Sequence, residues 1–330
     1  MSDTTAIEVG GLTKTYGPRT AVPVYAVRDL TFSIGAGELV GLLGPNGAGK
    51  TTTVKCIASL VTPTCGRVLI RGWDTATHRR ETLQQIAVVL EGNRNTYWRL
   101  SPRENLQFFI GLHGLSVRKG RGVIDSLLSE FDLMSKRNTP VRELSRGMQQ
   151  KVAVACALAK GVDILLLDEP ALGLDVQTTN GMKTMLKRMT EEKGYTILVS
   201  SHDMHMIQDI CHRVLIMNEG ELVLDDMTES LISLFKAQAY RIEVKGQLPP
   251  VLAERLKGSY KGRIRVEQEH AGGTTILDVD LRSADEIYEI IALMGRFNLP
   301  LVGVGKQFPD LKEIFLKTIG APPPSKGEHV

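Results

Sequence analysis

The segment GPNGAGKTT at residues 44–52 constrains this chain more than any other feature. It fits the pattern of Gly, four residues, Gly, Lys, then Ser or Thr. An apolar run of strand length, ELVGLL, precedes it, and TTTVKCIASL follows with helical spacing that places Val54, Ile57 and Leu60 on one face. Strand, glycine turn and helix in this order direct backbone amides and a helix N-terminus at an anion. The sequence therefore predicts a phosphate-binding loop made of Gly44, Pro45, Asn46, Gly47, Ala48, Gly49, Lys50, Thr51 and Thr52.

A second informative segment is ILLLDEP at residues 164–170. Four apolar residues predict a buried parallel strand, and open α/β sheets bind their ligands at the carboxyl edge of such strands. Asp168 and Glu169 fall at that edge. With Thr51 offering its hydroxyl, we expect Asp168 to hold Mg²⁺ directly or through water, and Glu169 to orient and polarise an attacking water. A plain acidic turn after a core strand is the alternative.

Two more segments place polar groups at the ends of regular elements. LSRGMQQKVAVACALAK puts Ser145 and Gly147 just ahead of an amphipathic helix, so that a hydroxyl and backbone amides lie at its positive end. Alone, this is an ordinary helix cap. YTILVSSHD predicts another buried strand, and His202 at its end can donate a hydrogen bond to a γ-phosphate. The order of the segments adds weight, because Ser145 precedes Asp168 by 23 residues and His202 follows Glu169 by 33.

In this order the four segments resemble the ATP-binding cassette (ABC) family over roughly residues 6–235. Residues 44–52 match its Walker A loop, residues 144–149 its LSGGQ signature loop and residues 164–168 its Walker B strand. By this resemblance Glu169 is the catalytic glutamate and His202 the switch histidine. The remaining positions that the resemblance assigns to nucleotide contact are Tyr16, as an aromatic that stacks on adenine, and Ser145, Gly147, Met148 and Gln149 of the signature loop.

The resemblance also implies a fold, a substrate and partners. We expect a P-loop NTPase of the α/β class over residues 1–235, with a helical subdomain at about 92–160. ATP with Mg²⁺ would lie between two chains, clasped by the Lys50 loop of one and the signature loop of the other. The second chain would be another copy or a paralogous subunit. Separate membrane permease subunits would supply the transport pathway, and Gly173, Leu174 and Asp175 resemble the D-loop at the dimer interface.

Two residues depart from the family pattern. Glu91 stands where the family usually has a glutamine. Its carboxylate can still approach Mg²⁺, but it adds a negative charge near the γ-phosphate. Arg146 stands where glycine is common in the signature loop. Its guanidinium either reaches a phosphate or faces water, and we expect water.

The segment NRNTYWRLSPREN, residues 93–105, is the expected contact with the permease. It follows Glu91 and carries two large aromatic residues, Tyr97 and Trp98, in a stretch that is otherwise polar. One interpretation is an exposed docking surface, in the region where the family receives the coupling helices of its membrane partner. The other is that both rings pack under the helix that begins near Pro102.

The sequence changes character after about residue 235. Strands and helices in the order βαββαβα predict a small ferredoxin-like α/β domain over residues 240–320, followed by a disordered tail at 321–330. No catalytic constellation falls in it, so we expect a dimerisation or stabilising role in preference to ligand sensing. Its closing segment PDLKEIFLKTIG resembles that of type-two ABC exporters, which export drugs, antibiotics and polysaccharides.

Composition excludes several other classes. With 40 basic and 37 acidic residues and no clustered basic run with interleaved aromatics, nothing indicates a nucleic-acid partner. The four cysteines lack metal-ligand spacing. No run of about 18 apolar residues or leader-like N-terminus is present, which predicts a cytoplasmic chain. The resemblance to ABC transporters implies that a permease would hold it peripherally at the inner face of the membrane. An importer ATPase with a C-terminal regulatory domain, a soluble non-transport ABC ATPase and a non-hydrolysing regulatory module remain alternatives.

Overall fold

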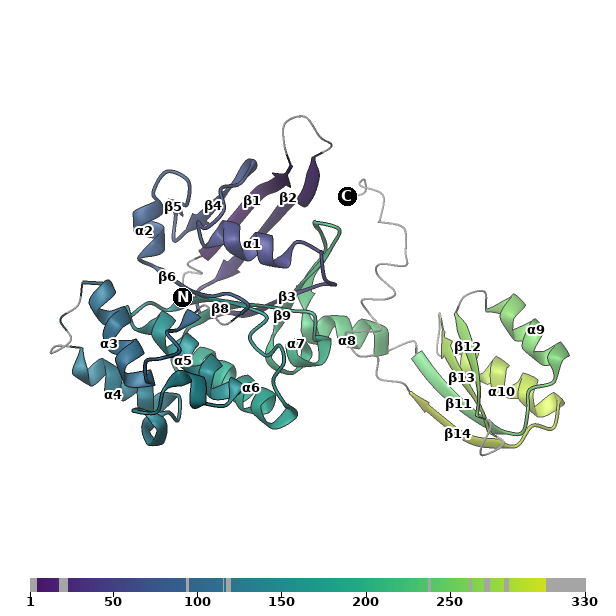
Figure 1. Cartoon of the computed structure of the whole chain (residues 1–330). Coiled ribbons are helices and arrows are strands. Elements are labelled where there is room, and N and C mark those ends of the chain that lie inside the picture. Colours follow the sequence, from purple (N-terminus) through teal and green to yellow (C-terminus); the bar gives the residue numbers. More distant parts are fainter. Residues whose placement is uncertain are drawn as a thin grey trace. The chain divides into compact units, whose positions relative to one another are not determined.

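The computed structural model describes residues 5–17, 23–92, 95–114, 116, 120–236, 239–260, 263–269, 274–281 and 285–306. These residues divide into two compact units at Met227 and Thr228 (Figure 1). The boundary lies earlier than the predicted residue 235, because the chain leaves the large sheet at the end of β10 (Glu221–Met227) and α8 (Thr228–Lys236) groups with the second unit.

The first unit is built on a six-stranded sheet in the order β10-β9-β3-β8-β7-β6. Five parallel strands are β6 (Ile86–Val89), β7 (Ile164–Asp168), β8 (Thr196–Ser201), β3 (Leu39–Leu43) and β9 (Arg213–Asn218), and β10 is antiparallel to β9. Every residue of β3, β7 and β8 is buried, as expected for strands covered on both faces. Their register aligns Leu43 with Ser201 and Asp168 with Ser200, so these strands end together.

A smaller sheet has the order β2-β1-β4-β5 and is antiparallel. It comprises β1 (Thr5–Tyr16), β2 (Val24–Gly35), β4 (Cys65–Ile70) and β5 (Trp73–Asp74). Helix α1 (Lys50–Ile57) lies between the two sheets and shares one hydrophobic core with both (Figure 1). Val54 and Ile57 are fully buried there, but the prediction for Leu60 is wrong, because the helix ends at Ile57 and Leu60 is 48% exposed. Ser59 is left-handed, with φ of 56°, which takes the chain out of the helix.

The other helices complete the first unit. Helices α6 (Val176–Glu191) and α7 (Met204–Ile210) follow β7 and β8, and α2 (Arg79–Leu83) precedes β6. Helix α7 lies against β3, where a Cβ added at Gly41 would come 2.4 Å from Ile207. The predicted helical subdomain contains α3 (Pro102–Leu112), α4 (Arg121–Glu130), the short 3-10 turns η2 (Met134–Lys136) and η3 (Val141–Glu143), and α5 (Arg146–Leu158).

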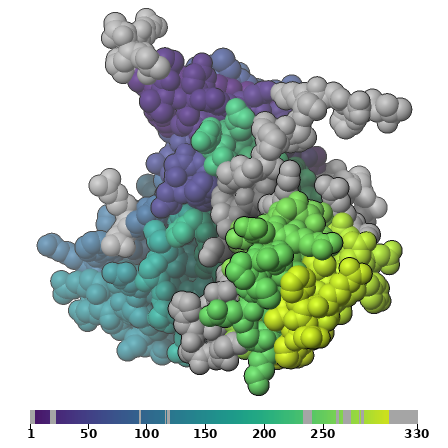
Figure 2. Space-filling view, turned by 90° about the vertical axis from the view of Figure 1, so that its right-hand side faces the viewer, coloured from purple at the N-terminus to yellow at the C-terminus, as the bar shows by residue number. Residues whose placement is uncertain are grey.

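The second unit has a four-stranded antiparallel sheet in the order β12-β13-β11-β14. Its elements run β11 (Ala239–Lys245), α9 (Pro250–Ser259), β12 (Ile264–Glu269), β13 (Thr274–Asp280), α10 (Glu286–Arg296) and β14 (Leu301–Lys306). This is the ferredoxin-like βαββαβ order, and the unit has a hydrophobic core of its own. Figure 2 shows one face of this unit, coloured green to yellow. The last predicted helix, within 309–320, and the tail at 321–330 lie outside the described residues. None of the described helices is long and apolar enough to cross a membrane.

Candidate active site

The predicted phosphate loop connects β3 to α1, and its backbone conformation needs glycine at defined points. Gly47 and Gly49 have φ of 86° and 99°, a region that residues with a side chain rarely adopt. A Cβ at Gly49 would lie 2.3 Å from the carbonyl oxygen of Ala26. Helix α1 begins at Lys50 without a side-chain cap and without an acidic residue in its first turn. Its first amides therefore remain available to an anion.

Lys50 is held by the loop itself. Its Nζ donates to the carbonyl oxygens of Gly44 at 2.7 Å and Pro45 at 3.2 Å, and lies 3.6 Å from Oε1 of Glu169. The side chain is only 6% exposed. A buried ammonium needs such oxygen partners, so a phosphate that enters the loop would replace oxygens that the protein now supplies.

Asp168 offers oxygen atoms suited to a divalent cation. Its Oδ1 accepts hydrogen bonds from the hydroxyls of Thr51 at 3.1 Å and Ser200 at 2.5 Å. Its Oδ2 is buried and has no hydrogen-bond partner among the described residues. An unsatisfied buried carboxylate oxygen beside a hydroxyl fits Mg²⁺, which takes a few protein oxygens and completes its shell with phosphate and water. The described chain has no cluster of three or more His, Cys, Asp or Glu residues placed to hold a metal.

Glu169 adopts a left-handed backbone conformation with φ of 49°. For a residue other than glycine this costs about 1–3 kcal/mol and is typical of functional sites. Its amide donates to the carbonyl of Ser200 at 3.1 Å. Its Oε2 lies 2.9 Å from Nδ1 of His202, and the carboxylate is 8% exposed. The fold therefore places the Glu169 carboxylate between Lys50 and His202.

A cleft of about 630 Å³ brings most of the predicted site together. Residues 46–52 of the loop line it with Tyr16, Glu91, Glu169 and His202. Tyr16 is 44% exposed, and Nζ of Lys14 lies 5.1 Å from its ring centroid. Sequence reasoning missed Val24, Tyr25 and Ala26 of β2, which also line the cleft. In the β1–β2 pair Tyr25 lies opposite Thr15, next to Tyr16, a pairing that the sequence alone does not reveal.

The signature-loop residues do not line this cleft. Ser145 caps α5 by accepting a hydrogen bond from the amide of Met148 at 3.3 Å. Gln149 donates to the carbonyl oxygens of Val141 and Leu144 at 3.2 and 3.0 Å. Gly147 was expected ahead of the helix, but it is buried in the first helical turn, because α5 already begins at Arg146.

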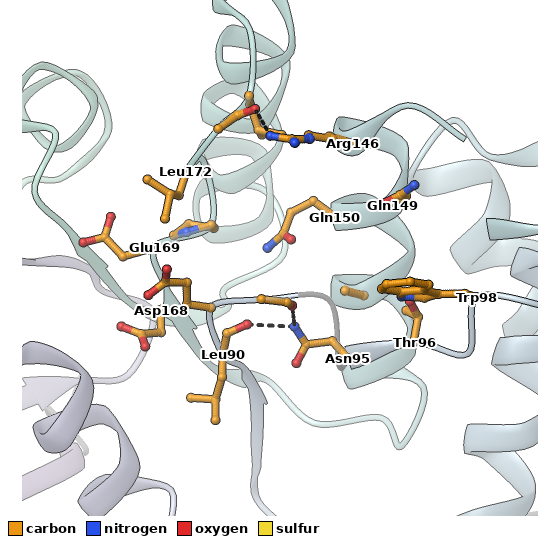
Figure 3. A pocket seen from close by; sticks show the side chains of 16 residues that line it. Leu90, Asn95, Thr96, Trp98, Arg146, Gln149, Gln150, Asp168, Glu169 and Leu172 are labelled. Atoms are coloured by element: carbon orange, nitrogen blue, oxygen red, sulfur yellow. Dashed lines mark hydrogen bonds between the residues drawn. The ribbon is translucent and has the colours of Figure 1, made fainter. Parts of the chain in front are cut away.

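A second cavity, of about 310 Å³, lies between the turn after β6, the start of α5 and the segment after β7 (Figure 3). Glu91, Arg146 and Glu169 are among the residues that line it. Arg146 is exposed, as expected of a guanidinium that faces water, and its Nη1 also donates to the carbonyl oxygen of Gly173 at 3.4 Å, a contact that the sequence did not predict. Sequence reasoning also missed Asn95, whose Nδ2 donates to the carbonyl oxygens of Leu90 and Gly92 at 2.7 and 2.9 Å and so holds the turn that carries Glu91.

The two aromatic residues expected at the permease contact are both about half exposed, Tyr97 at 50% and Trp98 at 51%. The Tyr97 ring packs edge-on against Phe108 of α3 at a centroid distance of 4.6 Å. Trp98 lines the second cavity. Neither interpretation holds alone: Tyr97 packs on the helix, but neither ring is buried beneath it.

The fold combines a parallel sheet, a glycine-rich loop that precedes a helix, and a neighbouring strand that ends in two acidic residues. Together these features define a P-loop NTPase. The particular family follows from comparison with known proteins. A family model described as ABC transporter matches residues 27–172. The ABC transporter ATP-binding protein NatA of Bacillus subtilis (strain 168) is 40% identical over 208 residues, 63% of this chain and 84% of NatA.

Other relatives extend further along the chain. The Nod factor export ATP-binding protein I of Rhizobium sp. (strain N33) is 30% identical over 315 residues, 96% of this chain and 97% of that protein. The methionine import ATP-binding protein MetN of Coxiella burnetii (strain RSA 493 / Nine Mile phase I) is 31% identical over 294 residues, 84% of this chain and 83% of MetN. A solved dimer of the ATP-binding cassette MJ0796 in a post-hydrolysis state with ADP and Pi is 28% identical, with a TM-score of 0.61, and covers 67% of this chain and 98% of that one. The chain belongs to the ABC transporter family and is an ATPase subunit of it.

Proposed function

We propose that this chain binds and hydrolyses ATP between two copies, or between itself and a paralogous subunit, and thereby powers export through separate membrane permease subunits. The observation that carries the ATPase part is the placement of Lys50, Glu169 and His202 around one cleft. Export is supported by the relative named for Nod factor export, which matches 96% of the chain.

ATP binding starts from groups that are already in place. Its phosphates would lie on the amides of residues 44–52 and draw Lys50 away from the carbonyl oxygens of Gly44 and Pro45. The adenine would stack on Tyr16, whose exposed ring lines the same cleft. Thr51 and Asp168 would hold Mg²⁺, which neutralises phosphate charge when bound. Glu91 lines the cleft as a further candidate ligand.

Hydrolysis would then depend on Glu169. Its carboxylate accepts a proton from water as the water oxygen forms a bond to the γ-phosphorus, and the bond from that phosphorus to the bridging oxygen of ADP breaks. His202, 2.9 Å from the carboxylate, would orient Glu169 and donate to the γ-phosphate. Lys50 lies near the other carboxylate oxygen of Glu169 and would stabilise the negative charge of the phosphate.

A second chain would complete each site. Ser145, Gly147, Met148 and Gln149 lie at the N-terminus of α5, a helix end that favours an anion, but none of them lines the cleft of their own chain. In a head-to-tail pair they would contact the γ-phosphate of ATP bound to the other chain. The dimer of the similar cassette MJ0796 supports this arrangement. We assign the C-terminal unit a stabilising or dimerising role.

The permease would dock on an aromatic surface beside the Glu91 turn. Tyr97, Trp98, Phe108 and Leu112 are each at least 40% exposed, and large aromatic residues are enriched in protein interfaces. This surface adjoins the second cavity through Trp98, so docking there bears directly on the turn that carries Glu91.

Import is the second candidate, because MetN matches 84% of the chain, including part of the C-terminal unit. Purification of the native complex from membranes, followed by reconstitution into vesicles, tests the direction. Export predicts ATP-driven movement of cargo away from the face that binds this chain. Movement towards that face, or a requirement for a secreted binding protein, would establish import.

A further inference from the structure

Arg146 is the first residue of α5, and its side chain crosses to the segment between β7 and α6 (Figure 3). Its Nη1 lies 3.4 Å from the carbonyl oxygen of Gly173. A cation in the first turn of a helix opposes the helix dipole, so helix stability does not explain an arginine here. Of the described residues that line the second cavity, Arg146 is the one cation, among the carboxylates of Glu91, Asp168 and Glu169.

The segment that Arg146 contacts begins at Glu169 and ends at α6. It consists of two overlapping turns, in which the amide of Leu172 donates to the carbonyl of Glu169 at 3.2 Å and the amide of Leu174 donates to Ala171 at 3.1 Å. At its far end Asp175 caps α6 by accepting from the amide of Thr178 at 2.8 Å. The Arg146 contact therefore holds the middle of a short segment whose first residue is Glu169.

The absence of a side chain at Gly173 permits this close approach. Its φ is 72°, and a Cβ built there would lie 3.0 Å from Nη1 of Arg146. The start of α5 is itself fixed against α6, because a Cβ at Gly147 would lie 1.9 Å from Cγ2 of Thr178. The first turn of α5, which carries Arg146, therefore cannot shift freely, and packing fixes its distance from Gly173.

We propose that Arg146 is a positioning residue for ATP hydrolysis in its own chain. By donating to the carbonyl of Gly173, its guanidinium fixes the path of residues 169–175 and with it the direction of the Glu169 carboxylate. This inference rests on the proposed role of Glu169 as the base. A contact between Arg146 and the ATP bound to a second chain is the competing role, and the two roles change different kinetic constants.

Steady-state hydrolysis by the full chain separates these roles. We expect Arg146→Ala and Arg146→Gly to lower kcat about fivefold, the effect of losing one modest hydrogen bond, with KM for ATP unchanged within about twofold. Arg146→Lys should keep at least about half of kcat, because one donor suffices for one carbonyl oxygen. The matched control is Arg142→Ala, which removes an exposed arginine whose ion pair is with Glu143 and should leave both constants unchanged.

Two further measurements distinguish a positioning role of Arg146 from an effect on folding and from direct contact with the nucleotide. The melting temperature of the alanine variant should match that of the wild type, and Glu169→Gln should still accumulate an ATP-bound dimer when combined with Arg146→Ala. A raised KM with normal kcat, or loss of that dimer, would assign Arg146 to nucleotide contact and overturn the inference. Unchanged kinetics, or a loss of kcat that follows the melting temperature and is not rescued by lysine, would also overturn it. If the wild type hydrolyses no ATP, the proposed function itself fails.

Discussion

At the level of single residues, the two adjacent carboxylates at the end of β7, Asp168 and Glu169, have different surroundings. Asp168 is buried, with one oxygen satisfied by Thr51 and Ser200 and the other without a described partner. Glu169, in a left-handed backbone conformation, turns its carboxylate towards Lys50 and His202. Under the proposed function, Asp168 would hold the cation and Glu169 would polarise the attacking water.

The Glu169→Gln variant should bind ATP but release phosphate about a hundredfold more slowly or worse, because an amide cannot accept the proton from water. A coupled phosphate-release assay under saturating ATP measures this. Glu38→Gln, a change at a partly exposed carboxylate just before β3, at the end of that strand opposite the phosphate loop, is a suitable control. Turnover at the wild-type rate would remove Glu169 from the role of base.

Lys50→Ala should weaken ATP binding at least about tenfold, since the loop loses its full positive charge at a buried position. Titration with a fluorescent ATP analogue measures the affinity. Lys55→Ala, on the same helix α1, is the matched control. Equal affinity in the wild type and Lys50→Ala would contradict the phosphate-loop assignment.

Only Cys65 of the four thiols should react with a maleimide in the native chain. Cys56, Cys156 and Cys211 are buried and Cys65 is exposed. Burial raises the pKa of Cys56 to about 11 and also raises the pKa values of Cys156 and Cys211, so their reactive thiolate forms are scarce near neutral pH. Mass spectrometry should find one label before unfolding and four after. Rapid labelling of a second native thiol would be inconsistent with this core.

At the element scale, strands could be predicted more reliably than contacts. The runs of β3, β7 and β8 are apolar throughout because both faces of the sheet are covered, and that pattern is visible in the sequence. The exposure of Leu60 follows locally from the end of α1 at Ile57. The packing of Arg146 on Gly173 and the position of Tyr25 in the cleft depend on segments distant in the chain. No local pattern encodes such contacts.

Helix α3 begins with a reciprocal cap that can be tested directly. The hydroxyl of Ser101 accepts from the amide of Glu104 at 3.3 Å, and the Glu104 carboxylate accepts from the amide and hydroxyl of Ser101, each at 2.8 Å. Ser101→Ala should cost about 1 kcal/mol of unfolding free energy. Urea denaturation measures it, with Ser129→Ala, in the last turn of α4, as a control.

The same cap predicts a pH dependence. The hydrogen bonds from Ser101 lower the pKa of Glu104 below its ordinary value of 4.5. A carboxyl with a lowered folded pKa contributes stability above its unfolded pKa and loses it as pH falls through the folded value. The difference in stability between wild type and Ser101→Ala should therefore shrink as the pH drops below about 4.5. A difference that grows on acidification would contradict the cap.

At the scale of the whole molecule, the sequence predicts both the cassette and the ferredoxin-like order of the second unit. That order could be predicted because apolar and polar residues alternate in β11 and β13 and apolar residues recur at helical spacing in α10. The structure of one chain places Lys50, Glu169 and His202 around one cleft. Under the proposed function this cleft is one half of a composite site, and the start of α5, which does not line it, is the half that would serve another chain.

The central claim is that one ATP is bound between two chains and that its hydrolysis lets them separate. The most direct measurement is the molar mass of Glu169→Gln in solution, by light scattering, with Mg-ATP, with Mg-ADP and without nucleotide. The account predicts a dimer with Mg-ATP and a monomer in the other two conditions. A chain that remains monomeric with Mg-ATP, even when its membrane partners are supplied, would contradict it.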